Sequence, residues 1–361
     1  MNPVRLTGTV RVVGAGLLGT SIGLALSKAG LDVVLTDASP ANARLAIDYG
    51  AGRVPAAGDN PSVIVVCVPP DVTASVVEQE LAAFPNSVVT DVASVKVQVL
   101  KQLQDSGTAL DRYVGSHPMA GRERGGAMSA RADLFYTRPW VIAPHDGSSA
   151  QARSAVEMLA LDLGATPVVL DPQTHDRAVA MVSHVPQLVS SLLAARLVDG
   201  EQSDIALAGQ GLRDTTRIAA SDPKLWVQIL SANSSEVAKV LRNLATDLEQ
   251  VTNSLEEIDA PGALATIGDL LNRGNRGVEQ IPGKHGSSAR QYSQVVVMID
   301  DKPGQLARLL TEISEESINV EELSLEHSPG AQIGLVELSV LPSLEATLVD
   351  ALTKRGWRIA G

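Results

Sequence analysis

Two polar motifs interrupt apolar segments and carry side chains that could perform acid–base chemistry. Residues 114–123 read VGSHPMAGRE and contain His117, and residues 90–96 read TDVASVK and contain Ser94. A neutral imidazole can accept a proton near neutral pH, and a serine hydroxyl at the carboxyl edge of a sheet can hydrogen-bond that imidazole or a substrate hydroxyl. A structural interpretation also exists, because Ser94 can cap a helix and a histidine beside turn-forming residues is often structural. The two motifs therefore indicate a candidate site.

A glycine-rich loop precedes both motifs. Residues 14–19 read GAGLLG, follow a β-rich run and open a helical one. In that setting the first glycine allows a tight turn, the second lets the backbone approach a pyrophosphate, and the third packs the helix on the strand. Asp37 ends the next strand, where a carboxylate would hydrogen-bond the ribose hydroxyls of NAD and repel the 2′-phosphate of NADP. The pattern predicts an NAD-dependent dehydrogenase with cofactor contacts at Gly14, Gly16, Leu17, Leu18, Gly19 and Asp37.

The composition argues against several other classes of function. The chain has 361 residues, enough for two or three domains, and a formal net charge of −12. It has no cluster of lysine and arginine with interleaved aromatic residues, which argues against nucleic-acid binding. The six histidines are scattered without the spacing of metal ligands, and the one cysteine, Cys67, lies in an apolar run typical of a buried strand. We therefore expect a small-molecule substrate and no metal site.

The location can also be predicted from the sequence. No apolar run approaches the roughly 20 residues needed to span a bilayer. Residues 1–9 lack the basic and then apolar layout of an export signal. We expect a cytoplasmic protein.

The first 171 residues alternate β-rich and helical runs. The expected strands are 9–13, 32–36, 63–68, 88–90, 140–144 and 167–170, and the expected helices are 17–29, 72–83 and 149–163. Such alternation is typical of βαβ units in a doubly wound sheet. With few aromatic residues, the core must be built from Ala, Val, Leu and Ile, which also suits a parallel sheet covered by helices. We predict an α/β fold with a Rossmann-type domain over residues 1–171.

Residues 172–280 show helical periodicity and few strand patterns, which predicts an all-helical domain. A helix start at 221–223 is followed by an apolar stripe from Leu225 to Val251, with one gap at Asn233. A helix with so long a stripe needs a partner surface, so we expect a homodimer. Glycine and serine crowd residues 274–288, which disfavours regular structure and predicts a linker over residues 281–291.

A third domain is expected at residues 292–361. Strand patterns at 295–299, 318–320 and 333–340 alternate with helical patterns at 305–316 and 344–355. This order is typical of a small α+β unit of the ferredoxin-like βαββαβ type.

The combination of DVASVK, GSHPMAG and RDTTRIAASDPKLW resembles, in order and spacing, the prephenate and arogenate dehydrogenase family of tyrosine biosynthesis. The resemblance covers essentially the whole chain. It implies that His117 draws a proton from the ring hydroxyl as hydride leaves for NAD and the ring carboxylate departs as carbon dioxide. It also implies that Ser94 contacts this histidine and the hydroxyl, and that Arg217 clamps a substrate carboxylate. Lys96 is interpreted as a support for the loop or the cofactor side.

Further residues fall on family positions associated with the site. They are His184, Glu123, Asp214 and Trp226. Many relatives carry a second histidine three residues beyond the equivalent of His184, where this chain has Gln187, which we include as a substrate-binding candidate. The two carboxylates would serve polar networks and access to the site, and each of these residues also has a purely structural interpretation.

The last domain resembles an ACT regulatory domain. A turn of sequence DDKPG leaves the first strand, and Asn319 opens the expected next strand. In ACT domains a small ligand, commonly an amino acid, binds near such a turn. The resemblance implies tyrosine as a feedback effector, with Asp301, Gly304 and Asn319 as candidate contacts.

Three alternatives to NAD-dependent conversion of prephenate to 4-hydroxyphenylpyruvate are open. Arogenate shares the ring, hydroxyl and ring carboxylate of prephenate, so the sequence does not separate the two substrates. Sugar-acid and β-hydroxyacid dehydrogenases share the nucleotide fold but rely on a lysine for which this chain has no matching motif. A non-catalytic sensor of NAD and an amino acid would be expected to have degraded catalytic positions, whereas Ser94, His117 and Arg217 are intact.

Overall fold

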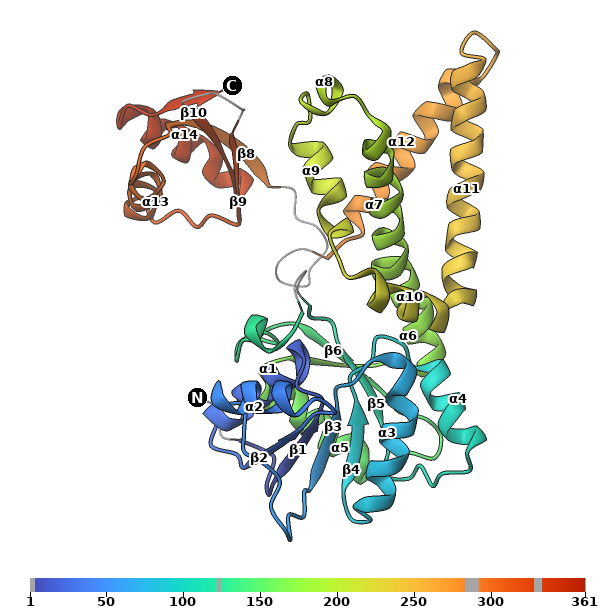
Figure 1. Ribbon diagram of the computed structural model, residues 1–361. Coiled ribbons are helices and arrows are strands. Elements are labelled where there is room, and N and C mark those ends of the chain that lie inside the picture. The colour runs from blue at the N-terminus through green and yellow to red at the C-terminus, as the bar shows by residue number, and fades with distance from the viewer. Residues whose placement is uncertain (1–3, 122–124, 283–291, 328–332, 361) are drawn as a thin grey trace. The chain divides into compact units, whose positions relative to one another are not determined.

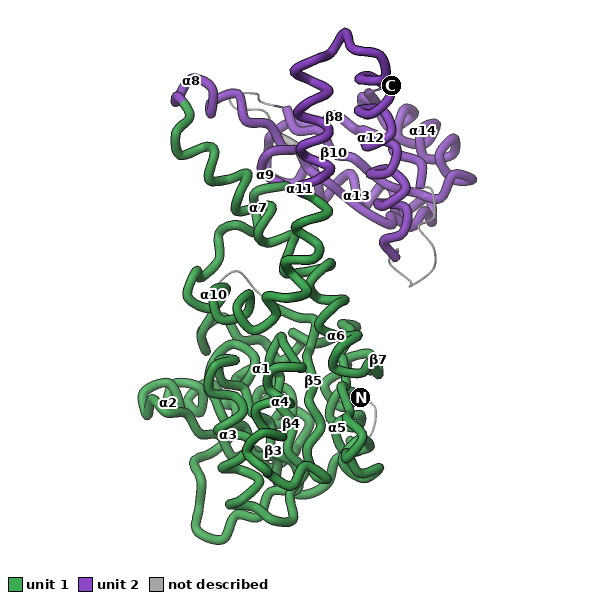
Figure 2. Tube along the Cα trace, turned by 90° about the vertical axis from the view of Figure 1, so that its right-hand side faces the viewer, with its two compact units in different colours: residues 1–200, 215–244 green, residues 201–214, 245–361 purple. Residues whose placement is uncertain are grey.

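The computed structural model describes residues 4–121, 125–282, 292–327 and 333–360. The chain divides into two compact units (Figure 2). Unit 1 comprises Met1–Gly200 and Thr215–Leu244, and unit 2 comprises Glu201–Asp214 and Ala245–Gly361.

Unit 1 begins with a parallel sheet in which a helix follows each strand (Figure 1). The strand order is β2-β1-β3-β4, and all neighbours run parallel. Every residue of β3 and β4 is buried, because a parallel sheet of this kind is covered on both faces. The elements are β1 (Val10–Val13), α1 (Leu17–Lys28), β2 (Val33–Thr36), α2 (Pro40–Asp48), β3 (Val63–Val66), α3 (Pro70–Ala83), β4 (Val88–Asp91) and α4 (Val97–Asp105). The predicted Rossmann-type sheet is confirmed.

A second sheet of unit 1 carries His117. Its elements are β5 (Gly115–Pro118), β6 (Pro139–Ala143), α5 (Ala150–Asp162) and β7 (Thr166–Val169). The connection between β5 and β6 contains the 3₁₀ turn η1 (Ala127–Ser129). Strand β5 runs antiparallel to β6, with His117 opposite Val141, and β6 runs parallel to β7. A bridge between Val89 and Tyr113 places the residues before β5 beside β4. The sequence did not predict β5, because a four-residue segment with glycine and proline has no strand pattern of its own and depends on pairing with β6.

Helices complete unit 1. They are α6 (Pro172–Val179), the π-helical turn η2 (Ala180–His184), α7 (Val185–Arg196), the 3₁₀ turns η3 (Leu197–Asp199) and η4 (Arg217–Ala219), α10 (Pro223–Ala232) and the first half of α11 (Ser234–Glu256). Helix α10 starts as predicted, since the Asp222 side chain accepts a hydrogen bond from Lys224 N. The expectation of one continuous helix through residue 251 is wrong. Asn233 has backbone angles of φ −118° and ψ 27° and separates α10 from α11.

The helical run Pro172–Asp199 is long and apolar enough to cross a membrane by length and composition alone, with a mean hydropathy of 1.5. This corrects the expectation that no segment comes near that length. Core helices of soluble proteins share this length and composition. Three ionisable side chains of this run, those of His175, Asp176 and His184, are buried and hydrogen-bonded within unit 1.

Unit 2 contains the second half of α11, most of the short helices α8 (Gln202–Ile205) and α9 (Gln210–Thr216), helix α12 (Ala263–Glu279) and a small α+β domain. Gly274 and Gly277, which we expected to interrupt regular structure, lie inside α12. Glycine lowers the stability of a helix but does not prevent the helical conformation. Residues 283–291 of the expected linker lie outside the described part of the chain.

The α+β domain has the predicted ferredoxin-like order. Its elements are β8 (Ser293–Asp300), α13 (Gln305–Glu315), β9 (Glu322–His327), β10 (Ile333–Val340), the turn η5 (Pro342–Leu344), α14 (Glu345–Lys354) and β11 (Arg358–Ala360). The sheet order is β11-β8-β10-β9, and all pairs are antiparallel. The core contains Val297, Leu309, Leu338 and Leu348. The expected strand at 318–320 is wrong, since β9 starts only at Glu322.

Candidate active site

The glycine loop has the shape of a phosphate cradle. Gly14 has φ +109°, and a Cβ there would lie 2.3 Å from the Cys67 carbonyl oxygen. A Cβ on Gly19 would lie 1.9 Å from the Gly14 carbonyl oxygen, whereas a Cβ on Gly16 would meet no atom within 4 Å. Packing therefore requires glycine at positions 14 and 19, whereas Gly16 faces open space that a ligand can fill.

The neighbouring groups also fit a dinucleotide. Helix α1 starts without a side-chain cap, so its first-turn N–H groups, including those of Leu17 and Leu18, can face an anion. The Asp37 carboxylate accepts hydrogen bonds from Ala15 N and Ser39 N, each at 2.7 Å. These bonds fix the carboxylate beside the loop and leave lone pairs that can accept from ribose hydroxyls. The loop and Asp37 thus fit the predicted cofactor.

Two glycine variants should separate cofactor binding from folding. Gly16→Ala is expected to weaken NAD binding by about tenfold or more while the melting temperature stays near that of the wild type, because the new methyl group enters only the ligand space. Gly14→Ala is the comparison, and it should lower the melting temperature because it combines a clash with a positive φ. Calorimetric titration with NAD and thermal unfolding would measure both effects. Equal NAD affinity in Gly16→Ala and the wild type would contradict the cradle.

His117 lies on β5 and is fixed by a second histidine. Its Nδ1 lies 2.9 Å from Nε2 of His175, and the two rings meet edge to face with centroids 5.1 Å apart. Burial lowers the pKa of His117 well below its usual value, and His175, Lys96 and His184 lower it further. The imidazole is therefore neutral near pH 7 and able to accept a proton.

A buried ion pair holds β5 against β4. Lys96 Nζ contacts the Asp91 carboxylate and donates a hydrogen bond of 2.7 Å to the Ser116 carbonyl oxygen, next to His117. The Tyr113 hydroxyl donates to the same carboxylate at 2.7 Å. Burial lowers the pKa of Lys96, and the negative charge of Asp91 opposes this shift. This geometry matches the loop-supporting interpretation of Lys96.

Asp176 on α6 connects the sheet to the helices. Its carboxylate accepts hydrogen bonds from Lys96 N at 2.8 Å and Val97 N at 2.9 Å, and so caps α4. The same carboxylate lies 2.7 Å from His175 Nδ1. Its main-chain carbonyl oxygen accepts a hydrogen bond of 2.8 Å from the side chain of Asn233. Both strand β5, through His175 and His117, and the break between α10 and α11 are thus linked to Asp176.

His184 is the second candidate that the structure places in this network. Its Nδ1 lies 3.2 Å from the amide nitrogen of Asn233, and its ring meets Trp226 edge to face with centroids 6.1 Å apart. Burial lowers the pKa of His184 to about 4. Its Nε2 is buried and has no hydrogen-bond partner in the part of the chain that the structure describes.

Ser94 is not hydrogen-bonded to His117 in this structure. It lies half-buried in the loop between β4 and α4, and no described residue forms a hydrogen bond with its side chain. His117 Nδ1, the ring nitrogen facing the protein, is already occupied by His175. The expected contact of Ser94 with a substrate hydroxyl stays a prediction.

The remaining predicted site residues lie on the helices of the chain or outside its described part. Gln187 on α7 is buried and donates a hydrogen bond of 2.7 Å to the Ser221 hydroxyl. Arg217 is exposed on η4, which packs against α7. Asp214 is exposed on α9 and accepts a hydrogen bond of 2.8 Å from Gln210, and Glu123 lies outside the described residues.

The sequence prediction missed three residues of the network. His175 and Asp176 lie within the proline-started helix α6 and have the appearance of ordinary polar residues in the sequence, and only the fold brings them to His117. Asn233 was visible in the sequence as the gap in the apolar stripe from Leu225 to Val251. Among the described residues, no group of three or more His, Cys, Asp or Glu side chains could hold a metal ion.

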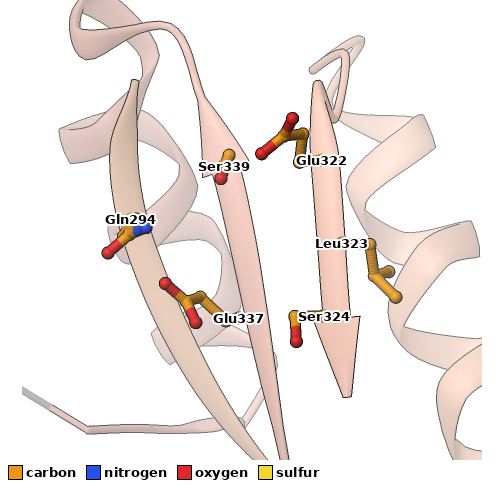
Figure 3. Close-up of a pocket in the computed structure, with 6 residues that line it drawn as sticks. All are labelled: Gln294, Glu322, Leu323, Ser324, Glu337 and Ser339. Atoms are coloured by element: carbon orange, nitrogen blue, oxygen red, sulfur yellow. The ribbon is translucent and has the colours of Figure 1, made fainter. Parts of the chain in front are cut away.

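The effector candidates lie at opposite ends of the α+β domain, because Asp301 and Gly304 follow the C-terminal end of β8, whereas Asn319 precedes β9 beside the other end of that strand. Asp301 is exposed, Gly304 has φ +87° at the start of α13, and Asn319 donates a hydrogen bond of 2.8 Å to Glu321. A shallow hollow lies elsewhere, across β8, β9 and β10 (Figure 3). It is lined by Gln294, Glu322, Leu323, Ser324, Glu337 and Ser339, and none of the three candidates contributes to it.

Comparison with known proteins identifies the family. A model of the prephenate dehydrogenase nucleotide-binding domain matches residues 22–169, and a model of the prephenate dehydrogenase dimerization domain matches residues 171–268. The probable prephenate dehydrogenase NovF of Streptomyces niveus is 34% identical over 356 residues, which cover 97% of this chain and 98% of NovF. The chain belongs to the prephenate dehydrogenase family. It is therefore an oxidoreductase with a nucleotide-binding domain, and the resemblance found in its motifs is confirmed.

Solved structures of similar proteins support the fold. Prephenate dehydrogenase from Aquifex aeolicus, in complex with hydroxyphenyl propionate and NAD⁺, is 22% identical with a TM-score of 0.66 and covers 75% of this chain and 98% of that chain. Synechocystis arogenate dehydrogenase is 25% identical with a TM-score of 0.61 and covers 75% of this chain and 99% of that chain.

Proposed function

We propose that this enzyme oxidises prephenate with NAD, releases the ring carboxylate as carbon dioxide and forms 4-hydroxyphenylpyruvate for tyrosine biosynthesis. The observation that carries the proposal is the neutral His117, whose Nδ1 is bound by His175 so that Nε2 is available to a substrate. The name and full-length similarity of NovF support prephenate as the substrate. The glycine cradle supports a dinucleotide, and Asp37 supports NAD rather than NADP.

The residues of the chain have separate tasks in this reaction. Bound NAD supplies the acceptor for the hydride that leaves the ring carbon bearing the hydroxyl. His117 takes the hydroxyl proton on Nε2, loss of the ring carboxylate as carbon dioxide makes the ring aromatic, and His117 returns the proton to the resulting phenolate oxygen. Arg217 holds a substrate carboxylate with its planar guanidinium group, and Ser94 contacts the hydroxyl. Because aromatisation drives the step, the protein mainly orients and polarises the substrate.

Arogenate is the second candidate substrate. The similarity to Synechocystis arogenate dehydrogenase favours it, and arogenate differs from prephenate only in an amino group in place of the keto group. The residues assigned above contact groups that both molecules share. The chemistry would be unchanged, and only the branch of tyrosine biosynthesis would differ.

Initial rates of NADH formation test the proposal. Prephenate and arogenate would each be assayed with NAD and with NADP. Turnover of prephenate with NAD and at least tenfold lower kcat/KM with NADP is the expected result. Turnover of arogenate alone would support the second candidate, and no turnover of either substrate would contradict both.

The pH profile should reflect the lowered pKa of His117. A base must be neutral to accept a proton, and a pKa below the usual value keeps His117 neutral to lower pH. The value of kcat/KM for prephenate is therefore expected to stay level down to about pH 6.5 and to fall only below it. Measurements between pH 5 and pH 9, with stability checked at each pH, would test this. An acid limb with its midpoint above about pH 7 would contradict the assigned environment of His117.

The proposed enzyme is a soluble cytoplasmic homodimer. Helices α11 and α12 expose several large apolar side chains, among them Leu248, Leu255, Leu264, Leu271 and Val278, each 59 to 71% exposed. Such a set on helices matched by a dimerization-domain model supports association through this part of the chain. Light scattering of the purified protein should give twice the mass of one chain.

We also place tyrosine feedback in the C-terminal domain. The ferredoxin-like order and the positive φ of Gly304 at the turn into α13 support an ACT-type domain. Because Asn319 lies at the opposite end of β8 from Asp301 and Gly304, a ligand that contacts all three would lie between two copies of the domain. Tyrosine should bind in calorimetric titration and change the initial rate with prephenate. Absence of both effects would contradict feedback without affecting the assignment of the reaction.

A further inference from the structure

His117 and His184 of unit 1 are both linked to Asp176, through different groups of that residue. The carboxylate of Asp176 contacts His175, which contacts His117, and the carbonyl oxygen of Asp176 contacts Asn233, which contacts His184. Apart from the half-buried His117, all members are at most 5% exposed. Since each group in such a network must donate or accept, the hydrogen bonds show which ring nitrogen carries the proton of each singly protonated imidazole.

The first branch fixes the proton of His117. Both carboxylate oxygens of Asp176 accept main-chain N–H groups, so the carboxylate acts as an acceptor toward His175 Nδ1 as well. Neutral His175 then has a bare Nε2, which must accept from His117 Nδ1. Neutral His117 consequently carries its proton on Nδ1 and presents a bare Nε2.

The second branch fixes the proton of His184 in the opposite way. A carbonyl oxygen can only accept, so Asn233 must turn its NH₂ group toward the Asp176 carbonyl oxygen. The same nitrogen lies 3.2 Å from His184 Nδ1, which must then be the acceptor. Neutral His184 carries its proton on Nε2, the atom that has no partner among the described residues. A buried N–H group without a partner is costly, which favours a ligand atom that accepts from it.

We propose that Asp176 sets these histidines in opposite tautomers, so that His117 offers a bare Nε2 to the substrate hydroxyl and His184 donates its Nε2–H to a carboxylate or keto oxygen of the substrate. The substrate part rests on the proposed function. His175, Asp176 and Asn233 are positioning residues, since they act through the two histidines. An N–H donor at His184 suits an oxygen acceptor and cannot accept from an ammonium group.

Nuclear magnetic resonance of the free enzyme tests the tautomers directly. In deuterated protein with ¹⁵N-labelled histidine, long-range ¹H–¹⁵N correlations show which ring nitrogen carries the proton, and single histidine variants assign the signals. The expected result is a proton on Nδ1 of His117 and on Nε2 of His184. The opposite tautomer at either residue would overturn the proposal.

Asn233→Asp changes the second branch with minimal change in shape. Because a carboxylate accepts rather than donates, it should draw a proton onto His184 Nδ1 and raise the KM for prephenate about tenfold, with a smaller change in kcat. Asn243→Asp makes the same substitution at an exposed position of α11 and should change neither quantity. An Asn233→Asp variant that folds and keeps His184 bare at Nδ1 would overturn the proposal.

His175 variants test the first branch. His175→Leu should lower kcat roughly 100-fold with little change in KM, because His117 loses the partner that fixes its tautomer. His175→Gln can donate to Asp176 and accept from His117, so it should recover most of kcat. Equal kcat in the two folded variants would overturn this branch.

The substrate contact of His184 has its own probe. Binding of 4-hydroxyphenylpyruvate should shift the His184 Nε2–H signal, whereas tyramine, which has the same ring but an ammonium group and no carboxylate, should not. An unchanged signal at saturating 4-hydroxyphenylpyruvate would overturn the contact. The tautomers are measured without substrate, so predicted tautomers in an enzyme that does not convert prephenate would contradict the proposed function alone.

Discussion

Replacing His117 by asparagine is expected to lower kcat for prephenate by about 10²- to 10⁴-fold, the usual contribution of a positioned general base. Asparagine is polar and fits the space on β5, but it cannot take up the hydroxyl proton. Since His117 is linked to the fold mainly through His175, the variant should still fold. Initial rates at saturating prephenate and NAD would measure the loss.

The affinity for NADH is the control for this variant. In the described part of the chain the glycine loop and Asp37 form no hydrogen bond with His117, so they should bind the cofactor normally, which fluorescence titration would show. A folded His117→Asn enzyme with normal cofactor affinity and kcat within a few-fold of the wild type would contradict the role of His117 as the base.

Replacing Lys96 by methionine is expected to lower the free energy of unfolding by about 3–5 kcal/mol. Lys96 and Asp91 are both almost fully buried, so the variant leaves a carboxylate in the interior without its cation. It also removes the hydrogen bond to the Ser116 carbonyl oxygen, which fixes β5. Equilibrium unfolding in urea, followed by circular dichroism, would give the change in free energy.

Lys101→Met is the matched control. Lys101 lies one turn further along the same segment and pairs with Asp105 at 2.7 Å, but both side chains are largely exposed. Such a surface pair contributes about 0–1 kcal/mol. The double variant Asp91→Asn with Lys96→Met should recover part of the loss, because it leaves no buried charge unpaired. A Lys96→Met protein no less stable than Lys101→Met would show that the buried pair does not stabilise β5.

Regular elements with a strong periodic pattern were predictable from the sequence. The alternating runs before residue 91 and the strand at Ile333–Val340 lie where their patterns place them. Strand β5 was not predictable, because its four residues become a strand only through pairing with β6. The break at Asn233 was visible as a polar gap but was interpreted as part of one helix, since helical periodicity continues on both sides of it.

The candidate site was predictable in its motifs and not in its contacts. His117 and His184 stand out as histidines within recognisable motifs, whereas His175 lies 58 residues after His117 and carries no motif of its own. Nothing in a single sequence indicates that Asp176 caps a helix 80 residues earlier, because such a contact arises only when the whole unit has folded. The partner of His117 Nδ1 is likewise His175 rather than Ser94, which the sequence could not reveal.

The most direct test of the central claim is the stoichiometry of one turnover with prephenate labelled with ¹³C in the ring carboxylate. NADH would be measured by absorbance, labelled carbon dioxide by mass spectrometry and 4-hydroxyphenylpyruvate by chromatography. An NAD-dependent oxidative decarboxylation predicts equal amounts of all three products. NADH formed without labelled carbon dioxide, or no NADH at all, would contradict it.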